Sequence, residues 1–331
     1  MKDYQIFAGI DVSKEKLDIC AFNNISPDNQ KFLVVENNLP GFRKLLTWLK
    51  QFKGKAVVCL EHTGMYALPV CVFLSEKKID YMLTPAIQIQ KSIGIKRGKN
   101  DPADASAIAR YAYINRDRIK LYAMPHQVLM RLKLLHSYRD RLLSIKKMLT
   151  VPANEMKQFV AMAKDISKDS LAIAQKIDEK IKQVEAKILQ AIQSDEHCHR
   201  HYQLLISIPG IGPQAATQLL IVTQGFTAFD NARQLACYAG VAPFEYSSGK
   251  SIRGRTKVSH LANKKIKSML HLCSIVAMRY DPQLKAYHQR KIKEGKNSML
   301  VINAIRNKIL HRIFAVIQRG TPFVKLNQYA A

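Results

Sequence analysis

The stretch IFAGIDVSKEKLDICAFNNISPDNQKFLVVE, residues 6–36, decides how this chain begins to fold. Three of its segments, at residues 6–11, 17–22 and 31–36, carry runs of apolar residues and are bounded by turn-type residues. Each segment therefore predicts a strand. The short connections between them predict a meander of three neighbouring strands.

Strand and helix patterns alternate after this meander. A doubly wound Rossmann sheet would alternate from the start, and the chain has no glycine-rich dinucleotide motif and no Walker motif. Three strands followed by alternation predict instead an α/β domain of the RNase H-like fold. The later elements are predicted as a helix at 41–52, a strand at 56–60, a helix after Gly64, a strand at 81–84, and helices from Pro85 and Asp101.

Two stretches in the middle of the chain carry apolar residues at alternating steps of three and four. The first runs from Leu135 to Leu149, Pro152 interrupts the pattern, and the second starts at Ile177. This spacing predicts an antiparallel helical hairpin or coiled coil, with two ordinary bundle helices as the alternative. A mainly helical segment follows. We therefore predict three domains, at residues 1–120, 121–198 and 199–331.

The charge of the chain is strongly positive and unevenly spread. The 331 residues include 52 Lys and Arg against 25 Asp and Glu, a net charge of +27. Residues 199–331 alone carry twenty basic residues and only four acids. Such an excess indicates a polyanionic partner, with nucleic acid as the first interpretation and an anionic membrane as the second.

Two features disfavour the membrane and indicate the cytoplasm. The chain has no apolar run of about 18 residues, the length that a spanning helix needs, and residues 1–10 lack the apolar stretch of a signal peptide. The six cysteines are scattered without a CxxC pair, as is typical of reduced thiols in cytosolic proteins. The His and Cys residues between His197 and His201 match no zinc pattern.

Four acids stand where a catalytic metal site would need them. Asp11 ends the first predicted strand, Glu61 follows the fourth, and Asp101 and Asp104 open a helix. Carboxylates that converge from different elements can hold two Mg²⁺ ions for phosphoryl transfer. The alternative is structural, because an acid at the start of a helix or after a strand is common without any metal.

Basic and glycine-rich segments are candidates for phosphate contacts. The PGIG turn with Gly210 and Gly212 resembles a helix-hairpin-helix element, although a simple inter-helix turn is the alternative. Ser248 precedes a basic segment, and taken alone it is a turn residue without a local base. The candidate basic residues are Lys91, Lys96, Arg97, Lys99, Lys250, Arg253, Arg255 and Lys257.

Five motifs in order resemble the DEDD transposases of the insertion-sequence one-ten family, which includes pilin-gene invertases and bridge-RNA-guided recombinases. The motifs are GIDVSK (9–14), EHTGMY (61–66), KNDPADASAIA (99–109), IPGIGPQAA (208–216) and YAGVAPFEYSSGKSIRG (238–254). The resemblance spans residues 5 to 320. It implies a RuvC-like domain, a coiled coil and a C-terminal transposase domain.

The resemblance also implies a chemistry. The four acids of the family match Asp11, Glu61, Asp101 and Asp104, which would hold Mg²⁺, and its essential serine matches Ser248, next to Ser247. It implies strand exchange through a transient phosphoserine link, donor and target DNA as substrates, and guidance by an element-encoded bridge RNA. We expect a homo-oligomer, a dimer that assembles to a tetramer, acting at the nucleoid in the bacterial cytoplasm.

Two alternatives remain at this point. The first is a RuvC-like structure-specific DNA nuclease with the same acids, in which metal-activated water cuts the strand and the serine has no role. The second is a non-catalytic scaffold that binds nucleic acid, in which the acids only cap helices and turns.

Overall fold

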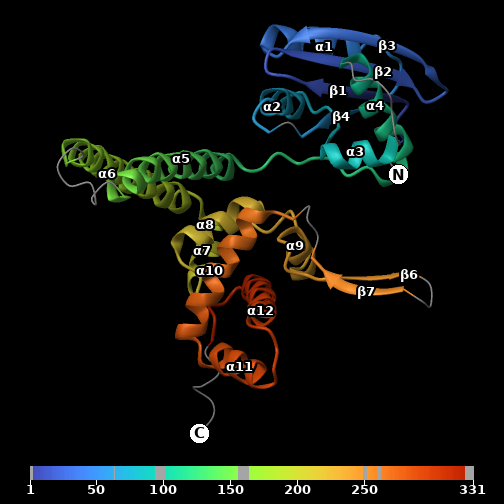
Figure 1. Ribbon diagram of the computed structural model, residues 1–331. Coiled ribbons are helices and arrows are strands. Elements are labelled where there is room, and N and C mark those ends of the chain that lie inside the picture. The colour runs from blue at the N-terminus through green and yellow to red at the C-terminus, as the bar shows by residue number, and fades with distance from the viewer. Residues whose placement is uncertain are drawn as a thin grey trace. The chain divides into compact units, whose positions relative to one another are not determined.

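The computed structural model describes residues 3–62, 64–93, 101–155, 164–248, 252–258 and 262–324. The chain divides into two compact units, Met1–Met124 and Pro125–Ala331 (Figure 1). The second unit holds the long helical pair together with the C-terminal helices. The division into three domains at residues 1–120, 121–198 and 199–331 stays a prediction.

The first unit is built on a five-stranded mixed sheet. Strands β1, β2 and β3 pair antiparallel, whereas β4 runs parallel to β1 and to β5. This confirms the predicted meander, and the strand order and directions are those of the RNase H-like fold. The order is β3-β2-β1-β4-β5, with β1 at Ile6–Val12, β2 at Lys16–Asn23, β3 at Ser26–Glu36, β4 at Ala56–Glu61 and β5 at Tyr81–Thr84.

Helices cover both faces of this sheet. α1 (Leu39–Leu49) and α2 (Leu68–Glu76) share a core with Ile10 and Leu60, whereas α4 (Asp101–Ile114) shares the other core with Phe7 and Cys59. Side chains alternate along a strand, so odd-numbered residues of β1 and β4 lie on the α4 face. The unit is completed by α3 (Ala86–Ile93) and the 3₁₀ turn η1 (Arg116–Arg118).

The second unit begins with the predicted helical pair, α5 (Gln127–Glu155) and α6 (Lys164–Gln193). Arg139 pairs with Glu185 at 2.7 Å and Lys146 with Asp178 at 2.6 Å, so the two helices run antiparallel. The coiled-coil supercoil stays a prediction. Pro152 does not end α5, which continues to Glu155, contrary to the interruption expected there. A proline inside a helix removes one backbone hydrogen bond and bends the helix, but it need not end it.

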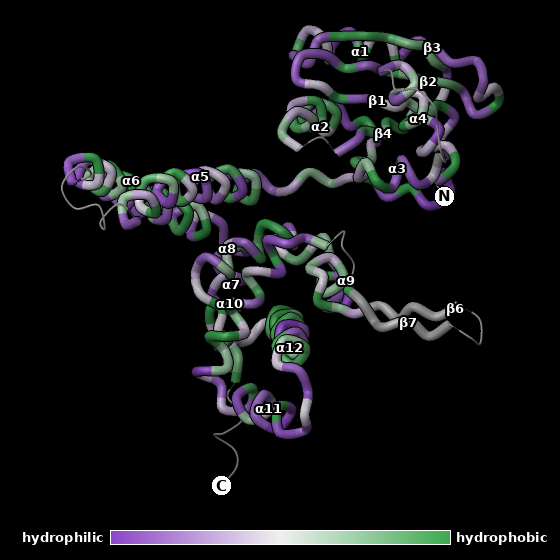
Figure 2. The backbone as a smooth tube through the Cα atoms, in the orientation of Figure 1, coloured by the Kyte–Doolittle hydropathy of each residue, from purple (hydrophilic) through white to green (hydrophobic). Residues whose placement is uncertain are grey.

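Within its described residues, the second unit contains six further helices and a hairpin. Figure 2 shows hydrophobic residues prevailing along α12 and hydrophilic residues along α11. No helix within the described ranges is long and apolar enough to cross a bilayer. The elements are α7 (Glu196–Ile206), α8 (Pro213–Val222), α9 (Ala232–Tyr238), β6 (Phe244–Ser248), β7 (Ile252–Lys257), α10 (Lys264–Tyr280), α11 (Pro282–Lys293) and α12 (Ser298–Arg319).

Ser248, which taken alone was interpreted as a turn residue, lies instead on a strand of the β6–β7 hairpin. The two segments pair antiparallel, with Ser247 opposite Arg253 and Ser248 opposite Ile252. Pairing gives the backbone N–H and C=O groups of both extended segments their partners, which a loop would have left to water. Helix α11 was not expected either, because its sequence is mostly polar. In the structure, only one of its residues, Leu284, is fully buried.

Candidate active site

The register of the central strands brings two of the predicted acids together. β1 and β4 are parallel neighbours, and Ile10 lies opposite Leu60, so Asp11 and Glu61 follow side by side where the two strands end. Both are odd-numbered and continue the row of Phe7 and Cys59, which packs beneath α4. The two carboxylates therefore lie on the α4 face of the sheet.

Helix α4 adds the other two predicted acids at its first turn, where Asp101 and Asp104 stand. Its close approach to β1 depends on Gly9, because a Cβ there would lie 2.2 Å from the backbone nitrogen of Ala109 and 2.4 Å from the carbonyl oxygen of Ala105. A side chain at position 9 would hold the helix away from the strand. Two residues further along the same strand lies Asp11.

Electrostatics show that these carboxylates are neighbours in space. The pKa of Asp11 is raised above its ordinary value, first because burial disfavours the charged form and then because Asp104, Asp101 and Asp18 carry like charges nearby. A hydrogen bond with the backbone of Val12 opposes this rise. Repulsion among these groups favours a cation in their midst.

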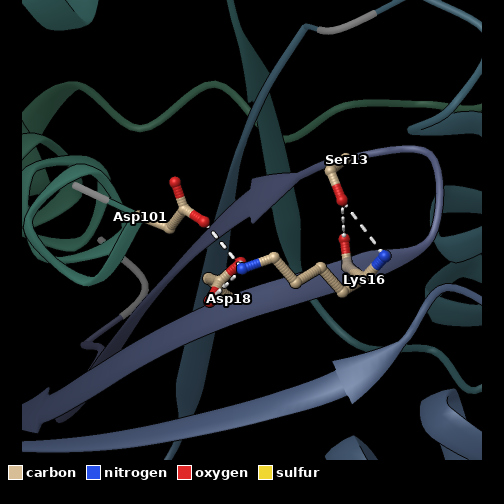
Figure 3. A network of polar contacts seen from close by, with 4 residues as sticks. All are labelled: Ser13, Lys16, Asp18 and Asp101. Carbon is tan, nitrogen blue, oxygen red and sulfur yellow. Dashed lines mark hydrogen bonds and ion pairs between the residues drawn. The ribbon is translucent and has the colours of Figure 1, made fainter. Parts of the chain in front are cut away.

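We call the four predicted acids the acid cluster. A lysine and a fifth acid lie beside the acid cluster and were missed in the sequence (Figure 3). Lys16 Nζ lies 2.6 Å from Asp101 Oδ2 and 3.2 Å from Asp18 Oδ2. Both carboxylates hydrogen-bond the ammonium and raise the pKa of Lys16, with Asp101 the larger cause. Asp18 is 5 % exposed and lies opposite Asp11 in the β1–β2 register. The available signal was an acid within the apolar segment LDICAF.

The donor set of the four predicted acids suits a hard divalent cation, since carboxylate oxygens are the ligands that Mg²⁺ prefers. The raised pKa of Asp11 is consistent with this, because a bound cation would favour the charged carboxylate against the burial and the like charges that raise its pKa. Across the part of the chain that the structure describes, no group of three or more His, Cys, Asp or Glu side chains is arranged closely enough to hold a metal ion. The residue types fit such an ion, but the carboxylates would have to move closer together to bind it.

The predicted nucleophile lies in the other unit. Ser248 is the last residue of β6, and Arg253, Arg255 and Lys257 lie on β7. Lys91 is exposed in the last turn of α3. The candidates that fall outside the described residues are Lys96, Arg97, Lys99 and Lys250.

The predicted glycine turn joins α7 to α8, and its two glycines differ. Gly210 has φ of +93° and lies against α10, where a Cβ would approach the carbonyl oxygen of Cys273 to 2.5 Å. Gly212 is the N-cap of α8, and nothing lies within 4 Å of a Cβ built there. Gly210 is thus required by the turn and its packing. Phosphate contact at either glycine, and the helix-hairpin-helix classification, stay predictions.

A basic hollow between α11 and α12 was not expected from the sequence. It has a volume of about 990 Å³, and its lining includes Arg290, Lys308, His311 and Arg312 but no acid. Lys308 Nζ lies 4.6 Å from the centroid of the Tyr287 ring. Asp281, 5 % exposed, forms an ion pair with Arg312 behind this lining. We call this hollow the basic groove.

Comparison with known proteins matches two transposase family profiles to this chain. The profile of the DEDD IS110 transposases matches residues 8–161, and that described as "Transposase IS116/IS110/IS902 family" matches residues 202–289. The first covers all four predicted acids and the second covers Ser248. Together they match both compact units.

Three relatives are similar over different lengths. The pilin gene-inverting proteins of Moraxella lacunata and Moraxella bovis are 27% and 26% identical over 327 residues, which cover 96% of this chain and 98% of theirs. An uncharacterized 43.6 kDa protein of insertion element IS110 from Streptomyces coelicolor is 30% identical over 145 residues, 44% of this chain and 35% of that protein.

Among solved structures, RuvC of Thermus thermophilus in complex with a Holliday junction substrate is similar to part of the chain. The match has 16% sequence identity and a TM-score of 0.27, and it covers 36% of this chain and all of RuvC. A second structure of the same protein gives 17% identity and the same TM-score.

Proposed function

This chain belongs to the IS110 family of transposases, and from that premise we propose that it moves a DNA element by strand exchange through a transient phosphoserine link. Donor and target DNA are the substrates, so the protein acts in the bacterial cytoplasm. The proposal assigns metal binding to the acid cluster of the first unit and the nucleophile to a serine of the second.

One observation carries the proposal. Asp11 is close enough to Asp101 and Asp104 for their charges to raise its pKa, and the strand register sets Glu61 beside it. Elements that lie 50 to 90 residues apart in the sequence thus bring like charges to one edge of an RNase H-like sheet. Such repulsion costs free energy without a cation, which a purely structural role for these acids does not explain.

The residues divide the chemistry between them. Asp11, Glu61, Asp101 and Asp104 would hold Mg²⁺, which supplies neutralisation of the charge that develops on the phosphate. Ser248 loses its hydroxyl proton and its Oγ attacks a DNA phosphorus. An O–P bond to serine forms, one bond to a deoxyribose oxygen breaks, and that oxygen leaves as a hydroxyl after taking up a proton. Attack by a hydroxyl of the other strand reverses the step, so no bond energy is lost.

Nucleic acid contacts are proposed along the basic segments and the basic groove. The groove offers several cations without an acid in its lining, together with the Tyr287 ring, which suits a phosphate backbone. We also propose guidance by a bridge RNA, as the family resemblance implies, because base pairing would then select the sequence while the protein holds backbones. Its support is the net charge of +27.

Salt titration tests the backbone contacts. Binding of the full chain to a radiolabelled duplex should weaken steeply with salt, and Lys308→Gln should reduce the slope of log K against log[salt] by about 0.9. Lys176→Gln, at an exposed position on α6, is the matched control and should leave the slope unchanged. An equal slope in both variants would remove the groove from the binding surface.

Self-association is proposed through the outer face of the α5–α6 pair. The apolar residues spaced by three and four along α5 and α6 are not available for this role, because Leu142 and Ile181 among them are buried in the core that the two helices share. Apolar side chains on the outside are exposed instead, among them Met148 at 75 % and Ile173 at 50 %. Met148→Lys should therefore weaken the dimer and tetramer without unfolding the pair, as light scattering of the full chain would measure.

Covalent capture separates the proposal from its rivals. With a suicide DNA substrate and Mg²⁺, the wild type should form an adduct that survives a denaturing gel and maps to Ser248. Ser248→Ala should bind DNA but form no adduct, whereas Ser247→Ala should retain most of it. Cleavage without an adduct would favour the RuvC-like hydrolytic nuclease, which has its own support because all four acids lie in one unit. No Mg²⁺-dependent cleavage by the wild type would favour the non-catalytic scaffold, whereas loss of that cleavage in Asp11→Ala would exclude it.

A further inference from the structure

We propose that Lys16 is an internal counter-ion of the acid site, which occupies Asp101 until a divalent cation displaces it and thereby lowers the affinity of the site for metal. This inference rests on the proposed function, because it takes the four acids as the metal-binding residues. It concerns a residue outside that set, and its partner Asp18 also lies outside it.

The position of Lys16 is built into the β1–β2 turn. Ser13 Oγ donates a hydrogen bond to the carbonyl oxygen of Lys16 at 2.8 Å and accepts one from its backbone N–H at 3.1 Å. The turn thus holds the backbone of Lys16 at the first position of β2. Residues i and i+2 of a strand share a face, so Lys16 lies on the same face as Asp18.

Asp18 anchors the ammonium from below. Its side chain is 7 % exposed and lies 3.2 Å from Lys16 Nζ, whereas the Lys16 and Asp101 side chains are 45 % and 54 % exposed. Figure 3 shows the lysine chain running along β2 to end between the two carboxylates. Asp18 is therefore the fixed partner and Asp101 the accessible one.

A cation that approaches Asp101 meets a carboxylate oxygen that already accepts a hydrogen bond from Lys16. Lys16 Nζ lies 2.6 Å from Asp101 Oδ2, the length of a short charge-assisted hydrogen bond. A divalent ion must break this bond or share the carboxylate with a like charge, and both weaken its binding. In the ion-free protein the same ammonium offsets part of the repulsion around Asp11. Lys16 thus stabilises the empty site and opposes its filling.

The long side chain makes the displacement reversible. Once it leaves Asp101, the ammonium remains beside the buried Asp18, two residues along the same strand. The exchange then requires rotation about side-chain bonds and no movement of β2. A lysine suits this exchange because it binds as a flexible point charge, whereas arginine binds carboxylates as a rigid fork.

Direct metal binding tests the inference without any recombination assay. The full chain, free of DNA, is titrated with Mn²⁺ and the free ion is measured by electron paramagnetic resonance. Lys16→Gln should bind Mn²⁺ about tenfold more tightly than the wild type, on the scale by which residues next to metal ligands change affinity. Lys16→Arg, which keeps the charge, should not gain affinity. Lys14→Gln is the matched control, because it removes an exposed charge from the same turn.

Each outcome decides a different question. Tighter binding by Lys16→Gln alone supports the counter-ion role. Equal affinities of the wild type, Lys16→Gln and Lys14→Gln overturn it, and they leave the metal site of the proposed function in place. Equal gains for Lys16→Gln and Lys14→Gln also overturn it, because they show only a general charge effect. If no variant binds Mn²⁺, the metal site itself fails, and this inference fails with it.

Discussion

The acid cluster of the first unit and the basic groove of the second each have a member paired with a residue of the opposite charge, Asp101 with Lys16 and Arg312 with Asp281, and these two residues are held differently. Lys16 is 45 % exposed and hydrogen-bonds side chains at the edge of the cluster. Asp281 is buried, forms an ion pair with Arg312, and caps α11 by accepting hydrogen bonds from the backbone N–H groups of Gln283 at 2.9 Å and Leu284 at 3.1 Å.

The difference separates a replaceable charge from a structural one. Lys16 can leave Asp101 at little cost, since exposed ion pairs contribute at most about 1 kcal/mol. Asp281 cannot, because its removal would leave the partly buried Arg312 without its counter-charge and the first turn of α11 without its cap. The charge that can be exchanged for another ion is therefore that of Lys16 in the first unit. In the second unit, Asp281 holds Arg312 of the basic groove in a fixed position.

The largest effect should follow from removing a carboxylate of the acid cluster. Asp11→Ala, Glu61→Ala, Asp101→Ala or Asp104→Ala should each lower recombination by roughly a thousandfold, since metal ions contribute several kcal/mol and about 1.4 kcal/mol is a factor of ten. A plasmid recombination assay measures the loss, and circular dichroism checks that the variants are folded. Near-normal recombination by any two of them would contradict the assignment of the metal site.

Loss of Asp281, the partner of the groove residue Arg312, should instead lower the stability of the fold. Asp281→Ala should lower the free energy of unfolding by about 3 kcal/mol, because it breaks a largely buried ion pair and a helix cap together. Asp281→Asn keeps a capping oxygen and should cost less. Urea denaturation of both variants is compared with Lys16→Gln, which should shift the midpoint little. Equal losses for Asp281→Ala and Lys16→Gln would erase the contrast between the two residues.

Glycines of the two units provide a second contrast. Gly9→Ala should destabilise the first unit by roughly 1–3 kcal/mol, because the new Cβ overlaps the backbone of α4 and pushes the helix carrying Asp101 and Asp104 away. Gly212→Ala in the second unit has open space and φ of −92°, so its unfolding should match the wild type. Thermal unfolding of both variants measures the difference, and an unaffected Gly9→Ala protein would show that α4 does not need this approach.

The smallest effect concerns the pH dependence of stability. The pKa of Asp11 is raised in the folded protein, so its ionised form destabilises the fold, and this penalty grows as pH rises from the unfolded pKa of about 3.9 through the folded pKa. In the presence of a chelator, Asp11→Asn should therefore melt above the wild type at neutral pH. The two melting temperatures should converge as the pH falls below about 4, where the Asp11 carboxyl of the wild type becomes protonated in both the folded and the unfolded state. A constant difference across this range would mean that Asp11 is not under electrostatic strain.

Several features could be predicted from the sequence because they depend on local patterns. The meander, the strand at 56–60 and the helix from Asp101 follow from hydrophobic periodicity and turn residues, and the structure confirms them. Asp11 and Glu61 could be placed at strand ends in the same way. Their roles as metal ligands, and that of Ser248 as nucleophile, stay predictions.

Other features depend on contacts between distant segments, and no local pattern contains them. The Lys16–Asp101 bond joins residues 85 positions apart. It exists because β2 lies beside β1 and because Gly9 lets α4 approach that strand. Likewise, the spacing around Leu142 predicts an apolar helix face, but only the structure shows which residues of the second helix bury it.

The sequence by itself determined the order of the elements, the excess of positive charge and the placement of acids at strand and helix ends, because these depend on neighbours within a few residues. Only the tertiary structure decided which charges meet. Electrostatic interactions depend on distance and burial, which strand register and helix packing set and which a linear pattern does not contain. Asp18 and Asp281 show this best: neither was a candidate site residue in the sequence, and burial beside a cation gives each of them its role.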